Sequence, residues 1–283
     1  MKNLAILAVA FLPLAAVASD DRNWKYEDQE TISRNFDLTA SSARKLLVDN
    51  RSGAIHVTGY NGSQVQITVQ KKIRAWSNEA LAEGKRDVKL DMSQQGNFVR
   101  LYADGPFRSD HYRGDDYYGY HVTFEYQVQV PADTELELKN TNSGIDVKHT
   151  TGPFDVHGLN GSISMDDVSG SGVVNTLNGP VKVTFTRNPE HDSEFHTLNG
   201  RIDVYFQPPL NADLHFQTLN GGVYSDFDVT ALPIQVSGST GSQDGRFLYR
   251  SHRNSGSARA GKGGPSLLFH TLNGRIELHS KAL

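Results

Sequence analysis

The stretch that decides the fold is a short phrase ending in Asn-Gly, which recurs through the second half of the chain. Four close copies are Asn175-Thr-Leu-Asn-Gly179, His196-Thr-Leu-Asn-Gly200, Gln217-Thr-Leu-Asn-Gly221 and His270-Thr-Leu-Asn-Gly274. Two weaker copies come before them, Asn140-Thr-Asn-Ser-Gly144 and His157-Gly-Leu-Asn-Gly161. Repetition of this kind indicates stacked units, each of which buries its apolar side chains against its neighbours.

Apolar residues keep a fixed phase after each glycine. The second position after the glycine holds Ile145, Ile163, Val181, Ile202, Val223 and Ile276, and the fourth holds Val147, Met165, Val183, Val204 and Leu278. Alternation with a period of two predicts a short strand after each glycine, and the glycine is expected to supply a positive φ at the corner. Further glycines, with only part of the repeated phrase around them, lie between the copies, so that Gly144, Gly152, Gly161, Gly170 and Gly179 are eight or nine residues apart. The interval lengthens to 21 residues from Gly179 to Gly200 and from Gly200 to Gly221.

Two all-β arrangements compete for this pattern. Asn-Gly favours hairpins, so an antiparallel meander is one alternative. A solenoid accounts for a second regularity that a meander does not require. A leucine stands two positions before the glycine in most copies, at a constant distance from the Ile or Val two positions after it, as stacked units with columns of equivalent side chains would need. These leucines are Leu159, Leu177, Leu198, Leu219 and Leu272. We therefore predict a parallel β-helix (β-solenoid), right-handed because such crossovers are the default. Leu198 is expected to be buried against Leu177 and Leu219, and Ile202 against Val181 and Val223.

Two polar columns accompany the apolar ones. The asparagines at the corners are Asn160, Asn178, Asn199, Asn220 and Asn273. Stacked asparagines bond one another and the turn backbone, so a structural ladder is predicted. Four positions before the glycines stand Asn140, His157, Asn175, His196, Gln217 and His270. Asn175 would hold the imidazoles of His157 and His196 about 10 Å apart, so a solvated face and no metal site are expected.

The first half differs from the repeats. Residues 30–139 are predicted to form a β-rich capping half with one short helix from Ser77 to Val88, where Ser77 is the N-cap. Strands are expected at Val88–Met92, Phe98–Tyr102 and Val122–Val130. The repeat half spans 140–283, and residues 238–264, rich in Gly, Ser and Arg, form a loop insertion before the last copy.

This order of parts resembles the bacterial putative-adhesin family, exported domains of unknown function with a β-helical fold. The resemblance covers about residues 30 to 281. It is carried by Ser52-Gly53-Ala-Ile-His-Val57, Glu79-Ala80-Leu81, Tyr126-Gln-Val-Gln-Val-Pro131, the Thr-Leu-Asn-Gly series and the closing Gly263-Gly264-Pro-Ser-Leu-Leu-Phe-His-Thr-Leu-Asn-Gly274-Arg-Ile-Glu-Leu278. It implies a cell-envelope or surface context and supplies no catalytic residues.

The N-terminus predicts export. Lys2, the apolar run from Leu4 to Ala18 and the triplet Ala16-Val17-Ala18 are typical of a signal peptide over residues 1–18, followed by a flexible leader over 19–29. Export to the periplasm or medium is therefore expected, with no membrane span after cleavage. The absence of cysteine excludes disulfides and thiolate zinc sites. A net charge of −4, with both signs interspersed, gives no reason to expect nucleic-acid binding.

No catalytic residue or cofactor is predicted. The segment from Gly256 to Gly263 nearly matches the phosphate-binding loop motif, but it lacks the Ser or Thr that holds magnesium. A polysaccharide-active β-helix enzyme would need acids or basic groups converging on one face. The outward positions vary without such convergence: Asp146, Ser164, Lys182, Asp203, Tyr224 and Glu277.

One segment has the composition of a binding loop. Aromatic, Arg and His side chains suited to a protein or glycan surface crowd between two strands: Phe107, Arg108, His111, Tyr112, Arg113, Tyr117, Tyr118 and Tyr120. The alternative is a tyrosine-rich hairpin loop that packs on the side of the solenoid. The leading hypothesis is a non-catalytic, adhesin-like module that binds an envelope protein or glycan. The alternatives are the polysaccharide-active enzyme and a structural or regulatory partner of an envelope protein.

Overall fold

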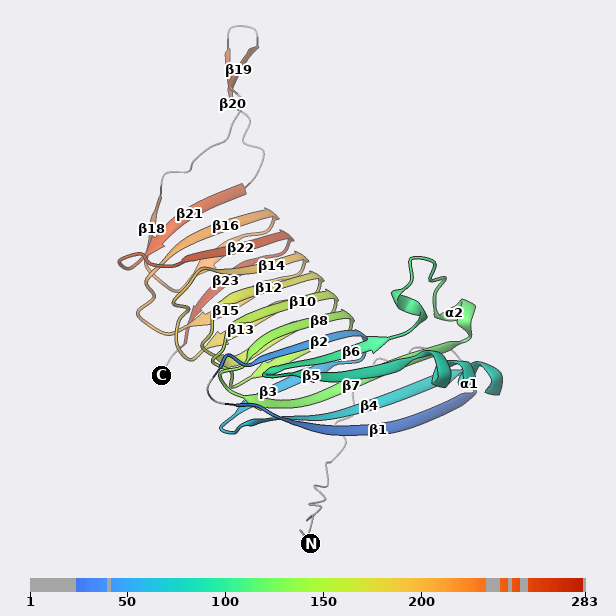
Figure 1. Cartoon of the computed structure of the whole chain (residues 1–283). Coiled ribbons are helices and arrows are strands. Elements are labelled where there is room, and N and C mark those ends of the chain that lie inside the picture. The colour runs from blue at the N-terminus through green and yellow to red at the C-terminus, as the bar shows by residue number, and fades with distance from the viewer. Residues whose placement is uncertain (1–23, 40–41, 233–239, 244–245, 250–253, 282–283) are drawn as a thin grey trace.

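The described part of the protein is mainly β, with two α-helices. The computed structural model describes residues 24–39, 42–232, 240–243, 246–249 and 254–281. Most strands form two long sheets (Figure 1), which have 10 and 11 strands. The inward side chains of both sheets share one core. The signal peptide predicted at 1–18 and the first part of the leader lie outside the described residues. No helix in the described part of the chain has the length and apolar character needed to cross a membrane.

Both sheets mix strands from the N-terminal part and the repeats. The 11-stranded sheet contains, in spatial order, β18 (Val229–Ala231), β21 (Asn254–Ala260), β16 (Ala212–Asn220), β22 (Ser266–Asn273), β14 (Ser193–Asn199), β12 (Gly172–Asn178), β10 (Phe154–Asn160), β8 (Glu135–Asn142), β2 (Lys45–Ser52), β6 (Phe98–Asp104) and β5 (Lys89–Gln95). The 10-stranded sheet contains, in spatial order, β1 (Tyr26–Asp37), β4 (Gln64–Ala75), β7 (Tyr120–Pro131), β3 (Ile55–Tyr60), β9 (Ile145–Lys148), β11 (Ile163–Val168), β13 (Val181–Phe185), β15 (Ile202–Phe206), β23 (Ile276–Ser280) and β17 (Val223–Ser225). A separate hairpin pairs β19 (Thr240–Gln243) with β20 (Arg246–Tyr249).

Parallel pairing dominates the repeats. Neighbouring strands are parallel from β6 to β16 in one sheet and from β7 to β17 in the other. We define a repeat unit as a strand of the 11-stranded sheet together with the next strand along the chain, which belongs to the 10-stranded sheet. Each repeat unit adds one strand to each sheet. Ile163 pairs in register with Ile145 on one side and Val181 on the other. The meander is therefore wrong for this part, and two long, largely parallel sheets are consistent with a β-solenoid-like fold.

The stacking order departs from chain order at the last repeat unit. β22 lies between β14 and β16 (Figure 1). β23 lies between β15 and β17. Ile202 consequently pairs with Ile276, and the predicted contact with Val223 is wrong. The long segment before β22 gives the last unit enough chain to return into the stack. Every unit exposes the same kind of strand edge, so the repeat phrase alone does not fix the order.

The leucine column faces outward, so its predicted burial is wrong. The side chains of Leu159, Leu177, Leu198 and Leu219 are 37–53% exposed, and Leu272 is half-buried. Alternation along β14 explains this, because Phe195 and Thr197 point inward and are buried. The Thr197 hydroxyl donates to the Gly179 carbonyl of the neighbouring unit at 2.9 Å. The Ile/Val column is buried as predicted, except Val223 in the edge strand β17, which is 39% exposed.

The repeat glycines are required chiefly by close packing between units. A Cβ on Gly200 would overlap the carbonyl oxygen of Gly179, and one on Gly274 would overlap that of Gly200. Neither glycine has a left-handed φ. The predicted positive φ is therefore not the reason for glycine at these two corners.

The N-terminal part contains one predicted helix and one unpredicted helix. α1 (Asn78–Asp87) begins after Ser77, whose hydroxyl accepts the Ala80 N–H at 3.1 Å, as expected for an N-cap. α2 (Asp115–Tyr118) was not predicted, because its single turn lies between two glycines in the tyrosine-rich segment. The predicted strands correspond to β5, β6 and β7.

Three predictions about how the chain is divided differ from the structure. β1 begins at Tyr26 and pairs antiparallel with β4 over its whole length, so residues 26–29 are strand and not leader. The boundary at 139/140 falls inside β8. The described part of the 238–264 insertion contains β19, β20 and β21, and β21 pairs antiparallel with β16.

Candidate binding surfaces

The tyrosine-rich loop, residues 105–119, connects β6 to β7. It contains a turn of 3-10 helix (Pro106–Arg108) and α2, and it lies at the same end of the long strands as α1 (Figure 1). Phe107 packs against the core cluster, and Tyr120, the first residue of β7, is buried. Burial raises the pKa of Tyr120 to about 12. These two predicted binding residues are therefore part of the base of the loop.

Asp115 is the centre of a hydrogen-bond network within the loop. Its carboxylate accepts a hydrogen bond from the Tyr112 hydroxyl, lies 2.7 Å from Nδ1 of His121, and lies 3.5 Å from the Arg51 guanidinium. Burial alone would raise the pKa of Asp115, but the hydrogen bonds from His121 and Tyr112 outweigh it and keep the pKa below its usual value. The network ties the loop to β2 and β7.

Aromatic packing and a second arginine complete the base. Tyr112 and Tyr118 stack with ring centroids 5.3 Å apart, and the Arg51 guanidinium lies 4.2 Å from the Tyr112 centroid. Arg108 donates to the Ala103 carbonyl at 2.9 Å and pairs with the Asp49 carboxylate at 2.9 Å. Tyr112, Tyr118 and Arg108 therefore have packing roles within the protein.

The tip of the loop is left exposed on this base. Of the predicted binding residues, His111, Arg113 and Tyr117 are exposed, and Tyr117 is 63% exposed. The Arg113 guanidinium lies 5.1 Å from the Tyr117 ring centroid, and Tyr117 contacts Tyr118 edge to face at 5.2 Å. The structure thus separates the predicted set into a packed base and an exposed tip.

The predicted asparagines form a ladder, which Asn142 extends by one further residue. In the spatial order Asn142, Asn160, Asn178, Asn199, Asn273 and Asn220, the side-chain amide of each asparagine after the first donates to the side-chain oxygen of the one before it, at 2.7–3.1 Å. The exposed leucines run beside this ladder. Both columns follow the intercalated order of the strands.

The predicted polar column is assembled differently in two places. Asn140 pairs with Gly158 and is buried, so it does not belong to the column; Lys139 takes the position next to His157. His196 and His270, far apart along the chain, are neighbours with ring centroids 5.7 Å apart. His157 and His196 remain separated by Asn175, as predicted.

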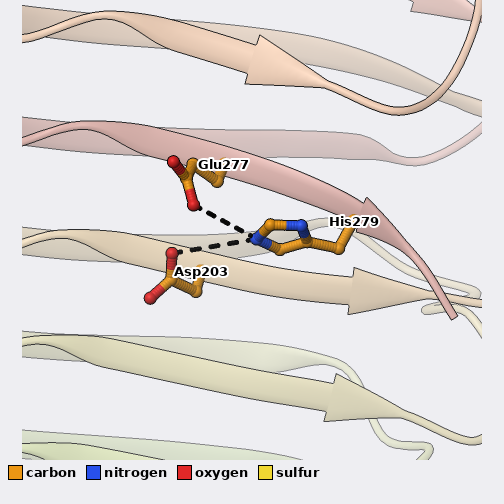
Figure 2. A group of neighbouring side chains, drawn as sticks. All are labelled: Asp203, Glu277 and His279. Carbon is orange, nitrogen blue, oxygen red and sulfur yellow. Dashed lines mark ion pairs between the residues drawn. The ribbon is translucent and has the colours of Figure 1, made fainter.

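One group of titratable side chains was missed. Asp203, Glu277 and His279 come together on the outward side of the 10-stranded sheet, with three potential ligand atoms within 4.8 Å of one another (Figure 2). The prediction that acidic or basic side chains do not converge on one outward face is wrong here, because β23 lies directly beside β15. The spacing of Glu277 after Gly274, equal to that of Asp203 after Gly200, was the available signal.

Comparisons with known proteins give a likeness of structure only. No family model matches the chain, and neither does any curated protein. A putative cell adhesion protein from Clostridium sporogenes is similar with a TM-score of 0.39 and 10% identity over 89% of this chain and 100% of that chain. A putative adhesin from Bacteroides fragilis has a TM-score of 0.39 and 11% identity over 89% and 97%. One from Parabacteroides distasonis has a TM-score of 0.27 and 8% identity over 88% and 97%. These three structural neighbours are putative adhesins or cell adhesion proteins at low sequence identity.

Proposed function

We propose that the chain is a non-catalytic, exported module of the cell envelope, built on a right-handed parallel β-solenoid, that binds a protein or glycan surface. The tip of the tyrosine-rich loop (His111, Arg113 and Tyr117) is the proposed contact. Export rests on the signal peptide predicted from residues 1–18, and handedness on the general preference of parallel crossovers. The product collected outside the cytoplasm should begin at Ser19.

The observation that carries this proposal is the exposed Arg113–Tyr117 pair on a fixed base. Tyr and Arg dominate many interfaces, because they bring contact area and directional hydrogen bonds. The base already holds Tyr112, Tyr118 and Asp115 in place, so little conformational entropy is lost when the tip binds. Loops on rigid β scaffolds commonly carry recognition in this way.

The proposal is tested on the mature protein with a glycan array and immobilised cell-wall material, followed by titration of the best ligand. The double variant Arg113→Ala/Tyr117→Ala should weaken binding at least about tenfold with an unchanged melting temperature. Tyr224→Ala is the matched control, since Tyr224 on β17 is 61% exposed, close to the 63% of Tyr117. The control should bind like the unmodified protein.

Two results would overturn parts of the proposal. If the double variant binds as well as the unmodified protein, the contact with the ligand does not lie at the tip of the tyrosine-rich loop. Mass spectrometry of the bound glycans after incubation should show no shortening. Shortened chains would favour the alternative, a polysaccharide-active enzyme.

A further inference from the structure

Asp203, Glu277 and His279 meet because the last repeat unit is intercalated. Asp203 on β15 and Glu277 on β23 are direct partners in the parallel register. His279 follows Glu277 by two residues and therefore points to the same outward face of the sheet. Figure 2 shows the imidazole directed between the two carboxylates.

Each carboxylate has one oxygen held by an arginine and one directed at the histidine. Arg201 contacts Oδ2 of Asp203 at 2.8 Å, and Arg275 contacts Oε1 of Glu277 at 2.9 Å. The other oxygens, Oδ1 of Asp203 and Oε2 of Glu277, lie 3.9 and 3.4 Å from Nε2 of His279. The arginines thus fix the direction in which the two remaining oxygens point.

The group leaves two buried polar atoms without a hydrogen bond. The Asp203 side chain is 7% exposed, and its Oδ1 has no hydrogen-bond partner among the described residues. The same holds for Nε2 of His279, which is also buried. A buried polar atom that lacks a hydrogen bond destabilises the folded state, because its lost hydration is not replaced. A ligand placed between these two atoms would satisfy both.

The imidazole is also fixed from its other sides. Tyr205 stacks on the His279 ring with centroids 4.4 Å apart and an interplanar angle of 19°. Nδ1 of His279 faces a carboxylate oxygen of Asp226 at 3.7 Å. A carboxylate on the far side of a ligating histidine is common in metal sites, because it orients the ring and fixes its tautomer.

We propose that Oδ1 of Asp203, Oε2 of Glu277 and Nε2 of His279 bind one divalent transition-metal cation of the zinc class, which fastens the C-terminal repeat unit to β15. An imidazole with two carboxylates suits Zn²⁺, and three protein ligands leave one position for water. Ca²⁺ and Mg²⁺ prefer oxygen ligands only. Arg201 and Arg275 offset the two carboxylate charges, so binding depends on coordination more than on net negative charge.

Calorimetric titration of chelator-treated, dialysed full-length protein tests the proposal. Zn²⁺ should bind at one site that is lost in the variants, and the same site should not take Ca²⁺. Asp203→Asn, Glu277→Gln and His279→Gln should each weaken that site by more than about tenfold. Zn²⁺ should also raise the melting temperature of the unmodified protein and not that of these variants, because binding to the folded state alone stabilises it.

His157→Gln is the matched control. His157 also contacts a carboxylate two residues away, that of Asp155 at 2.6 Å, but belongs to no three-ligand group in the described part of the chain. It should retain the full zinc response. Circular dichroism with chelator present checks that each variant is folded, and if Asp203→Asn does not fold, the Glu277 and His279 variants decide. No zinc binding, equal Zn²⁺ binding in those variants, or equal binding of Ca²⁺ would overturn the proposal.

Discussion

The β12–β13 and β22–β23 repeat units carry the same Thr-Leu-Asn-Gly phrase but reach their places differently. Among the strands of the 11-stranded sheet, β12 is the next after β10 along the chain and lies beside it, whereas β22 leaves chain order and lies between β14 and β16. The register and the buried columns are nevertheless the same in both units. A repeat phrase therefore specifies which side chains face the core, while the connecting segments specify where a unit stacks.

This difference has consequences for chemistry. Along the chain, Asp203 is far from Glu277, and His196 is far from His270, yet both pairs are direct neighbours in the sheets. Units that keep chain order also meet distant segments, since Asp146 on β9 pairs with His56 on β3 at 3.1 Å. The group of Asp203, Glu277 and His279, however, is created by the unit that leaves chain order.

The largest expected effect compares Phe195 with Phe269. Both rings are fully buried and stack on each other at 5.2 Å. Phe269→Ala should lower the free energy of unfolding by about 3–5 kcal/mol, and Phe195→Ala by a similar amount. Urea denaturation measures both. If Phe269→Ala costs less than about 1 kcal/mol, the last unit is peripheral and the comparison fails.

The asparagine ladder gives an intermediate effect. Asn273 donates to Asn199 and accepts from Asn220, each at 2.7 Å, and Asn178 likewise takes part in two ladder bonds. Asn273→Ala and Asn178→Ala should each cost about 1–2 kcal/mol. Asn142, with one ladder bond among the described residues, should cost about half as much. Equal losses at Asn142 and Asn273 in the same denaturation assay would argue against additive ladder bonds.

The smallest effect is expected at the leucine column. Leu198→Ala and Leu272→Ala should each cost less than about 1 kcal/mol, because these side chains are partly exposed. Truncation of a buried leucine costs about 2–5 kcal/mol. Thermal and urea unfolding distinguish the two ranges, and a loss above about 2 kcal/mol would show that the column is packed like the core.

Sequence reasoning found the strands and missed their order. The alternation after Gly200 correctly placed Ile202 and Val204 in the core, because side chains of a strand alternate between faces. The alternation does not continue unchanged across the corner at Gly200. Leu198, before the corner, therefore faces outward, and the prediction that it faces the core was wrong. α1 could be predicted from its Ser77 cap, whereas α2 depends on tertiary contacts of the tyrosine-rich loop. The equal spacing of Asp203 after Gly200 and of Glu277 after Gly274 places both residues in one column, but their contact also depends on stacking order, which no local signal encodes.

Cross-linking tests the intercalated order most directly, since the chain contains no cysteine of its own. Leu198 and Leu272 lie on adjacent strands, with neighbours paired in register on both sides, and adjacent strands are about 4.8 Å apart. Leu219 lies one strand further away. Under mild oxidation, Leu198→Cys/Leu272→Cys should form a disulfide, because bridged Cα atoms lie about 4.4–6.8 Å apart. Leu198→Cys/Leu219→Cys should stay reduced. Peptide mass spectrometry that finds the second cross-link and not the first would contradict the intercalation of the last unit.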